Sequence, residues 1–106
     1  MSKFLWKASY TTDGVKGVLK DGGSGRRDAV QKLIESAGGK MDAFYFAFGD
    51  ADVYVIADFP DNVSVAAASA TVNASGAVEV GTVILLTPEE VDQAVAKSVD
   101  YRAPGG

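Results

Sequence analysis

The strongest pattern in this sequence is a pair of apolar segments within residues 41–59, separated by Gly49-Asp50-Ala51-Asp52. Each segment has the length and composition of a strand, and the residues between them are typical of a tight turn. Alternate side chains of a strand point to opposite faces, and here both sets are apolar. A sheet with one face in water alternates apolar with polar residues, so we expect one face to be covered by helices of this chain and the other by a second subunit. The sets are Met41, Ala43, Tyr45 and Ala47 opposed to Phe44, Phe46 and Phe48, and Val53, Val55, Ala57 and Phe59 opposed to Tyr54 and Ile56.

Strand and helix patterns also occupy the segments on either side of this pair. Residues 3–10 alternate as a strand, and residues 77–86 predict another strand with apolar residues on both faces. A helix capped within residues 11–13 is expected to be short, because the glycine-rich run 21–25 interrupts it. A firmer helix over residues 26–37 follows, with apolar residues at helical spacing and glycines after its end.

Two more helices are predicted in the C-terminal half. Asp61 or Asn62 caps a helix that continues to about Ser75 and is rich in alanine, which allows close approach to a sheet. A second helix begins with a capping box at 87–90, with proline at its first position, and continues to about Val99. We expect one domain over residues 1–99 and a flexible tail over residues 100–106.

The predicted order of elements is strand, helix, strand, strand, helix, strand and a final helix. This is the ferredoxin-like βαββαβ arrangement, an α+β fold with a four-stranded antiparallel sheet, here with an extra C-terminal helix. Both crossover helices of that fold cover the same side of the sheet, so its other side is bare. A bare apolar face of several hundred square ångströms is unusual for a monomer, and we therefore expect two chains to pair sheet to sheet as a dimeric α/β barrel.

Composition narrows the possible functions of the chain. Its 106 residues, 47% hydrophobic and 23% charged, fit one globular domain. The absence of cysteine and histidine removes disulfides, the usual metal ligands and the commonest catalytic base, so we expect no metal and no cofactor. The formal charge of −4 opposes nucleic-acid or membrane-surface binding. No segment has the pattern of a membrane span or a signal peptide, so a cytoplasmic location is expected.

Three segments of the sequence resemble the GYD-domain family, small bacterial proteins related to the dimeric α/β-barrel group. They are Gly38-Gly39-Lys40, the apolar segments on either side of the turn, and Pro60-Asp61. The name-giving pattern maps to Gly49, Ala51 and Asp52, so its tyrosine is missing here. The family is largely without assigned activity, and the resemblance therefore implies the fold more than the function.

Four aromatic residues and one carboxylate are best suited to line a ligand pocket. Such pockets are mainly apolar with a few hydrogen-bonding groups, and tyrosine and tryptophan supply both. Asp58 shares a strand face with Tyr54 and would act as a base if burial raised its pKa. The alternative, which is commoner for aromatic residues on strands, is packing in the core or at an interface. The candidate pocket residues are Trp6, Tyr10, Tyr45, Tyr54 and Asp58.

Two glycine-bearing segments each have a functional and a structural interpretation. In the turn, Asp50 and Asp52 could share a hard cation, but such cations usually take about six oxygens or more, so we favour a turn made by Gly49 and Asp50 in which Asp52 bonds nearby backbone amides. The run from Asp21 to Arg27 could bind an anion at a helix start, but it lacks the spacing of a phosphate loop. A flexible connection is the favoured interpretation there.

Three functions are consistent with the sequence. The leading hypothesis is a non-enzymatic homo-oligomeric module that binds a small apolar or amino-acid-like ligand in the barrel or at the subunit interface. The second is an enzyme resembling cofactor-free monooxygenases of the dimeric-barrel group, with Trp6, Tyr45, Tyr54 and Asp58 around the substrate. The third is a purely structural subunit of a larger assembly. The lack of histidine counts against the enzyme.

Overall fold

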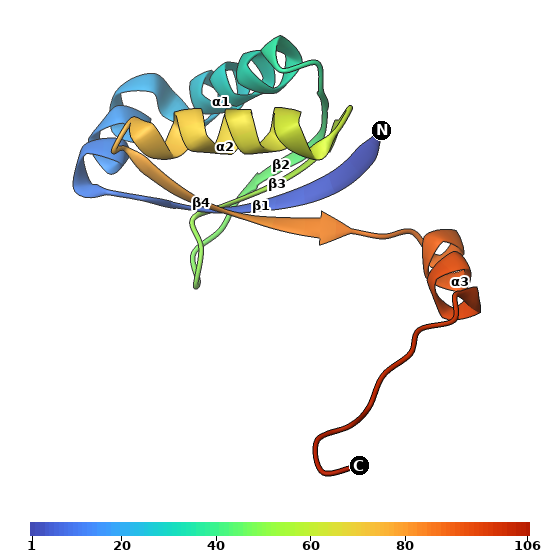
Figure 1. The fold of residues 1–106 in the computed structure, drawn as a ribbon. Coiled ribbons are helices and arrows are strands. Elements are labelled where there is room, and N and C mark those ends of the chain that lie inside the picture. The colour runs from blue at the N-terminus through green and yellow to red at the C-terminus, as the bar shows by residue number, and fades with distance from the viewer.

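The computed structural model describes all residues from Met1 to Gly106 as a two-layer α+β domain with a projecting C-terminal arm (Figure 1). Its four strands form one antiparallel sheet in the order β2-β3-β1-β4, and α1 and α2 lie on the same face of that sheet. The predicted ferredoxin-like βαββαβ fold with an extra C-terminal helix is therefore confirmed. The elements are β1 (Ser2–Tyr10), α1 (Thr12–Ser36), β2 (Lys40–Phe46), β3 (Val53–Phe59), α2 (Asn62–Ala74), β4 (Val78–Leu85) and α3 (Pro88–Ala96).

The core lies between the sheet and the two helices that cover it. Alternate residues of β1 and β3 face the helices, and Phe59 and Ile34 are completely buried there. The rings of Phe4 and Trp6 pack on Phe59 with centroid separations of 6.0 Å and 5.6 Å. At about 25 cal/mol per Å² of apolar surface, the burial of these aromatic side chains is a leading source of stability for the domain.

Helix α1 bends at the glycine-rich run that the sequence predicts to interrupt it. The two halves of α1 join at Gly22, whose backbone angles of φ 75° and ψ 170° are not helical. This conformation is accessible to glycine because it has no Cβ atom. The break is therefore confirmed, but the second half of α1 begins directly after it, so the run is part of the helix and not a separate loop.

Helix α2 begins where its predicted cap lies. The Asp61 carboxylate accepts a hydrogen bond from the Ser64 backbone N–H at 2.7 Å, and this bond lowers the pKa of Asp61. Val65 and Ala68 are buried against the sheet, and their small side chains let the helix lie close to it. Gly76, at φ 73°, follows the helix and leads the chain into β4.

Two details of the β2–β3 pair correct the sequence prediction. A β-bulge between Met41 and Ala43 shifts the register, so Met41 pairs with Ala57 and packs against the core, whereas Ala43 pairs with Ile56 on the opposite face. The prediction that Met41 and Ala43 share a face is wrong because the bulge adds a residue to the strand at Asp42. The predicted tight turn is also longer, since residues 47–52 form a loop that projects beyond the sheet (Figure 1).

Helix α3 and the residues after it project from the domain as an arm (Figure 1). The capping box of Thr87 and Glu90 forms as predicted, but α3 ends at Ala96 and not near Val99. No residue of α3 is buried, so packing does not extend the helix beyond its capped start. The radius of gyration is 16.7 Å, against about 13 Å for a compact domain of this length, which reflects this extension.

The start of α1 is joined to the start of β4 by a close backbone contact. The Thr11 backbone N–H donates to the Ala77 carbonyl at 3.0 Å, and the Thr11 hydroxyl donates to the Gly76 carbonyl at 2.9 Å. Gly14 lies directly over this junction, where a Cβ atom would stand 2.0 Å from the Ala77 oxygen. Gly14 is therefore required by the packing of α1 on β4, although it weakens the helix locally.

We expect Gly14→Ala to lower the free energy of unfolding by about 1–3 kcal/mol, because the added methyl group must displace backbone. The control is Gly17→Ala in the same helix, where nothing lies within 4 Å of the added Cβ atom. That change is expected to raise the free energy of unfolding by about 0.5–1 kcal/mol. Urea denaturation of both variants measures the difference, and equal effects would contradict this account of the junction.

Candidate functional site

The sheet separates the five predicted pocket residues into two groups. Trp6 and Tyr10 lie on the face that the helices cover, and Trp6 is only 3% exposed. Tyr45, Tyr54 and Asp58 lie on the opposite face, where Tyr45 and Tyr54 are cross-strand partners. A single chain therefore does not bring all five around one ligand.

A cavity of about 250 Å³ lies between the sheet and the helices and contains the first group. Its floor comes from all four strands, and its roof comes from the second half of α1 and from α2. Its walls are apolar except for the side chain of Arg26. The lining residues are Trp6, Ala8, Tyr10, Arg26, Ala29, Val30, Leu33, Phe44, Val53, Val55, Val72, Val78 and Val80.

Trp6, which lines this cavity, carries a buried hydrogen-bond donor without a partner. Its indole Nε1 is buried and has no hydrogen-bond partner, and it is the one buried side-chain polar atom of the chain in that condition. Buried N–H groups are normally paired, because an unpaired one costs about 1–3 kcal/mol. Nε1 itself is covered, so Trp6 lines the cavity with other atoms of its side chain.

Arg26 is the charged residue of the cavity, and the predicted pocket did not include it. Its side chain is 27% exposed, and its closest carboxylate is that of Asp21, with 3.8 Å between nitrogen and oxygen. Arg26 forms α1's cavity-facing stripe together with Ala29, Val30 and Leu33. These positions are i, i+3, i+4 and i+7, so the helical spacing in the sequence predicts that Arg26 lies on the same face as the apolar residues.

A second, more open hollow of about 380 Å³ lies between the first half of α1 and the 47–52 loop. Tyr10 borders both spaces, so the hollow and the cavity are neighbours. Phe46 and Phe48 line this hollow and are 39% and 104% exposed, respectively. The sequence predicts that Phe46 and Phe48 are covered. Within a single chain both remain exposed to solvent beside the loop.

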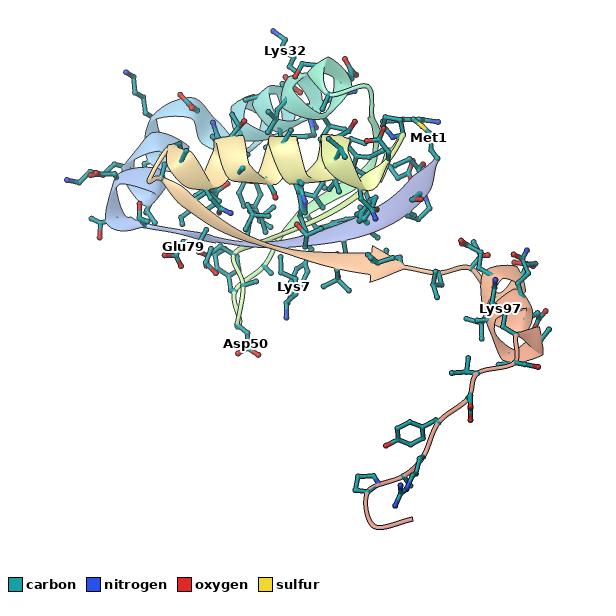
Figure 2. The ribbon with its side chains drawn as sticks, in the orientation of Figure 1. Met1, Lys7, Lys32, Asp50, Glu79 and Lys97 are labelled. Atoms are coloured by element: carbon teal, nitrogen blue, oxygen red, sulfur yellow. The ribbon has the colours of Figure 1, made fainter.

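The loop of residues 47–52 is anchored by Asp52. Its carboxylate accepts a hydrogen bond from the Tyr10 backbone N–H at 2.8 Å, and its own N–H donates to the Ala8 carbonyl at 2.8 Å. Gly49 and Asp50 lie at the far end of the loop, where Asp50 points away from the domain (Figure 2). The Asp52 side chain is thus engaged in tying the loop to β1, as its structural interpretation expects.

No group of three or more acidic, histidine or cysteine residues is arranged to hold a metal ion. The two carboxylates of the turn also have different environments, because Asp52 accepts a hydrogen bond from the backbone and Asp50 is exposed to solvent.

No helix of the structure has the length and apolarity needed to span a membrane.

The open face of the sheet, opposite the helices, has an apolar centre and charged edges. Lys3 forms ion pairs with Asp42 and with Asp58, the latter at 3.1 Å. These bonds raise the pKa of Lys3, and the Lys3 ammonium lowers the pKa of Asp42. Asp58 is therefore an ion-paired group near the end of β3 and not an isolated carboxylate in an apolar pocket. The apolar centre consists of Leu5, Ala43, Tyr54, Ile56 and Val83, with Tyr45 beside it.

Comparison with known families gives one result. The model of the GYD domain matches residues 4–95 of the 106-residue chain, from β1 to nearly the end of α3. The matched segment contains every residue that lines the cavity and the loop that Asp52 anchors. Comparisons with curated proteins and with solved structures each found no match.

We expect Asp52→Ala to lower the free energy of unfolding by about 1–3 kcal/mol, because the Tyr10 N–H loses its acceptor. Asp50→Ala in the same loop serves as the control and is expected to change stability by less than about 0.5 kcal/mol, because Asp50 is exposed. Thermal unfolding monitored by circular dichroism measures both. An Asp52→Ala variant as stable as the wild type would show that the bond is not needed to anchor the loop.

Proposed function

The chain belongs to the GYD-domain family, and from that premise we propose that it is a homodimeric module that binds a small, mainly apolar molecule in the cavity between its sheet and its helices. The observation that carries the proposal is this cavity of about 250 Å³, whose lining is apolar except for Arg26. The space is partly open to solvent, since its lining residue Arg26 keeps 27% of its side chain exposed, so a small molecule can reach it. Its mainly apolar lining with one charged group is typical of a small-ligand site.

The volume of the cavity sets the size of that occupant. A dry apolar cavity of about 150 Å³ is enough for benzene, and drug-sized ligands take about 300 Å³ or more. A space of about 250 Å³ lies between these limits. It suits a molecule with one ring or a branched aliphatic chain together with a short polar group.

Ligand binding is better supported than catalysis by a single chain. The monooxygenase-like alternative needs Trp6 and the Tyr54–Asp58 pair around one substrate, but these lie on opposite faces of the sheet. Asp58 forms an ion pair with Lys3 at 3.1 Å, so its carboxylate is already engaged near the end of β3. The purely structural alternative leaves the cavity without a role.

The open face of the sheet supports the homodimeric part of the proposal. Its apolar centre includes Leu5 and Ile56, and Lys7 and Glu79 project from the same side (Figure 2). Neither Lys7 nor Glu79 forms an ion pair within the chain. A face that carries both signs of charge around an apolar centre is complementary to a second copy of itself, as a two-fold interface requires.

The C-terminal arm adds a second reason to expect self-association. Leu86, Val91 and Val95 are 56%, 45% and 78% exposed, and further apolar side chains follow at Val99 and Tyr101. The capping box fixes α3 as a helix even though no residue of it is buried within the chain. An apolar stripe on a well-capped helix is stabilised when another surface covers it.

Trp6 is the only tryptophan of the chain, so its emission reports directly on the cavity. We expect small aromatic and branched aliphatic compounds to shift this emission and to raise the melting temperature. A compound at 100 times its dissociation constant should add about 2.7 kcal/mol of stability. Val72→Phe places a ring in the cavity and is expected to weaken binding at least about tenfold, which corresponds to about 1.4 kcal/mol.

The matched control for Val72→Phe is Val63→Phe on the same helix, because Val63 is 78% exposed and does not line the cavity. That variant should bind as the wild type does. Equal binding by both variants would place the ligand elsewhere. The absence of any response to a broad panel of such compounds would favour the structural alternative.

We expect Ile56→Lys to convert the dimer of 11.0 kDa chains into a monomer, because it places a charge in the centre of the open face. Val63→Lys on the outer surface of α2 is the control and should remain dimeric. Native mass spectrometry and sedimentation at micromolar concentration measure the outcome. A monomeric wild-type protein would refute the homodimer and leave the cavity unaffected.

A further inference from the structure

The electrostatics of the cavity extend the proposed function to a chemical class of ligand. We propose that the ligand is a small organic acid whose carboxylate binds Arg26 and whose apolar part occupies the space between sheet and helices. This inference rests on the proposed function, because it presupposes that the cavity binds a molecule.

Arg26 supplies the single charged side chain of the cavity lining, and it is half-buried. About three quarters of its side chain is removed from solvent, since 27% remains exposed, and the other lining residues of the cavity are uncharged. An arginine in such a position can pack its aliphatic stem along the apolar lining and present its guanidinium at the edge of the cavity.

No protein acceptor holds the Arg26 guanidinium in a hydrogen bond. Its single ion pair, to Asp21, has a separation of 3.8 Å. Asp13 borders an adjacent surface hollow that Arg26 also lines, but its carboxylate is not within ion-pairing distance. The neighbouring Arg27 differs, because it is more exposed and its Nε donates to Asp28 at 3.2 Å. The five N–H donors of Arg26 are thus available to a ligand.

The shape of the guanidinium selects the group that complements it. The guanidinium is planar and presents two parallel N–H groups that match the two oxygens of a carboxylate. The other end of the ligand must be apolar, because Val30, Leu33, Phe44 and Val72 line the rest of the space. A single ring or branched chain that carries one carboxylate fits both the volume and the polarity of the cavity.

The experiment compares phenylacetate with phenylacetamide, which has nearly the same shape but no charge. Titration calorimetry and Trp6 emission would measure binding of each to the wild-type protein, Arg26→Gln, Arg26→Lys and Arg27→Gln. We expect the wild type to prefer the acid by about tenfold or more, since a hydrogen-bonded charge pair is being gained. Arg26→Gln should abolish this preference without weakening amide binding.

The remaining variants separate charge, geometry and position. Arg26→Lys keeps the charge but loses the planar fork, so it should retain only part of the preference for the acid. Arg27→Gln removes one positive charge from the adjacent position and should leave both affinities unchanged. Thermal unfolding of each variant establishes that the fold is intact.

The possible failures of the two proposals differ. Equal wild-type affinity for acid and amide would overturn the organic-acid inference and leave the ligand-binding function standing. An equal loss of both ligands in Arg26→Gln would also overturn it, because Arg26 would then shape the cavity and not recognise charge. No binding of either compound at millimolar concentration would contradict the proposed function itself.

Discussion

The structure depends on the burial of one face of the sheet under two helices. Alternate residues of β1 and β3, among them Phe4, Trp6 and Phe59, pack against Ile34 of α1 and Val65 of α2. This contact fixes which residues are internal, because a strand alternates its side chains between two faces. It also leaves the opposite face with apolar side chains that no element of the same chain covers. Because both helices pack on the same face of the sheet, the cavity lies under them and the other face remains open.

Much of the fold is predictable from the sequence because its signals are local. The cap at Asp61, the capping box at Thr87 and the break at Gly22 each depend on a few neighbouring residues, and each is found where the pattern predicts it. The bulge at Asp42 is different, because it belongs to the pairing of two strands and not to either strand alone. The end of α3 was also misplaced, since the helix pattern continues beyond the point where packing supports it.

The candidate site was only partly predictable for a related reason. Residue type alone points to all five candidates, but only Trp6 and Tyr10 border the cavity, whereas Tyr45, Tyr54 and Asp58 lie across the sheet. Residue type does not say which face of a strand is internal; the packing of the helices decides that. The glycines before Arg26 suggest an anion-binding or flexible start to the helix predicted over residues 26–37, and not a residue of an apolar pocket. The helical register of Arg26 places it on the apolar stripe of α1 instead.

The alternation of β3 has a consequence for how this protein can change over evolutionary time. Val55 lines the cavity, and the next residue, Ile56, lies on the open face, so adjacent residues of β3 belong to different surfaces. Point substitutions can therefore adapt one surface while the other is conserved. Insertion or deletion of a single residue in this strand would exchange the two sets along part of its length. Among homologues, length changes should therefore be confined to the loops, whereas the two alternating sets of β3 diverge at independent rates.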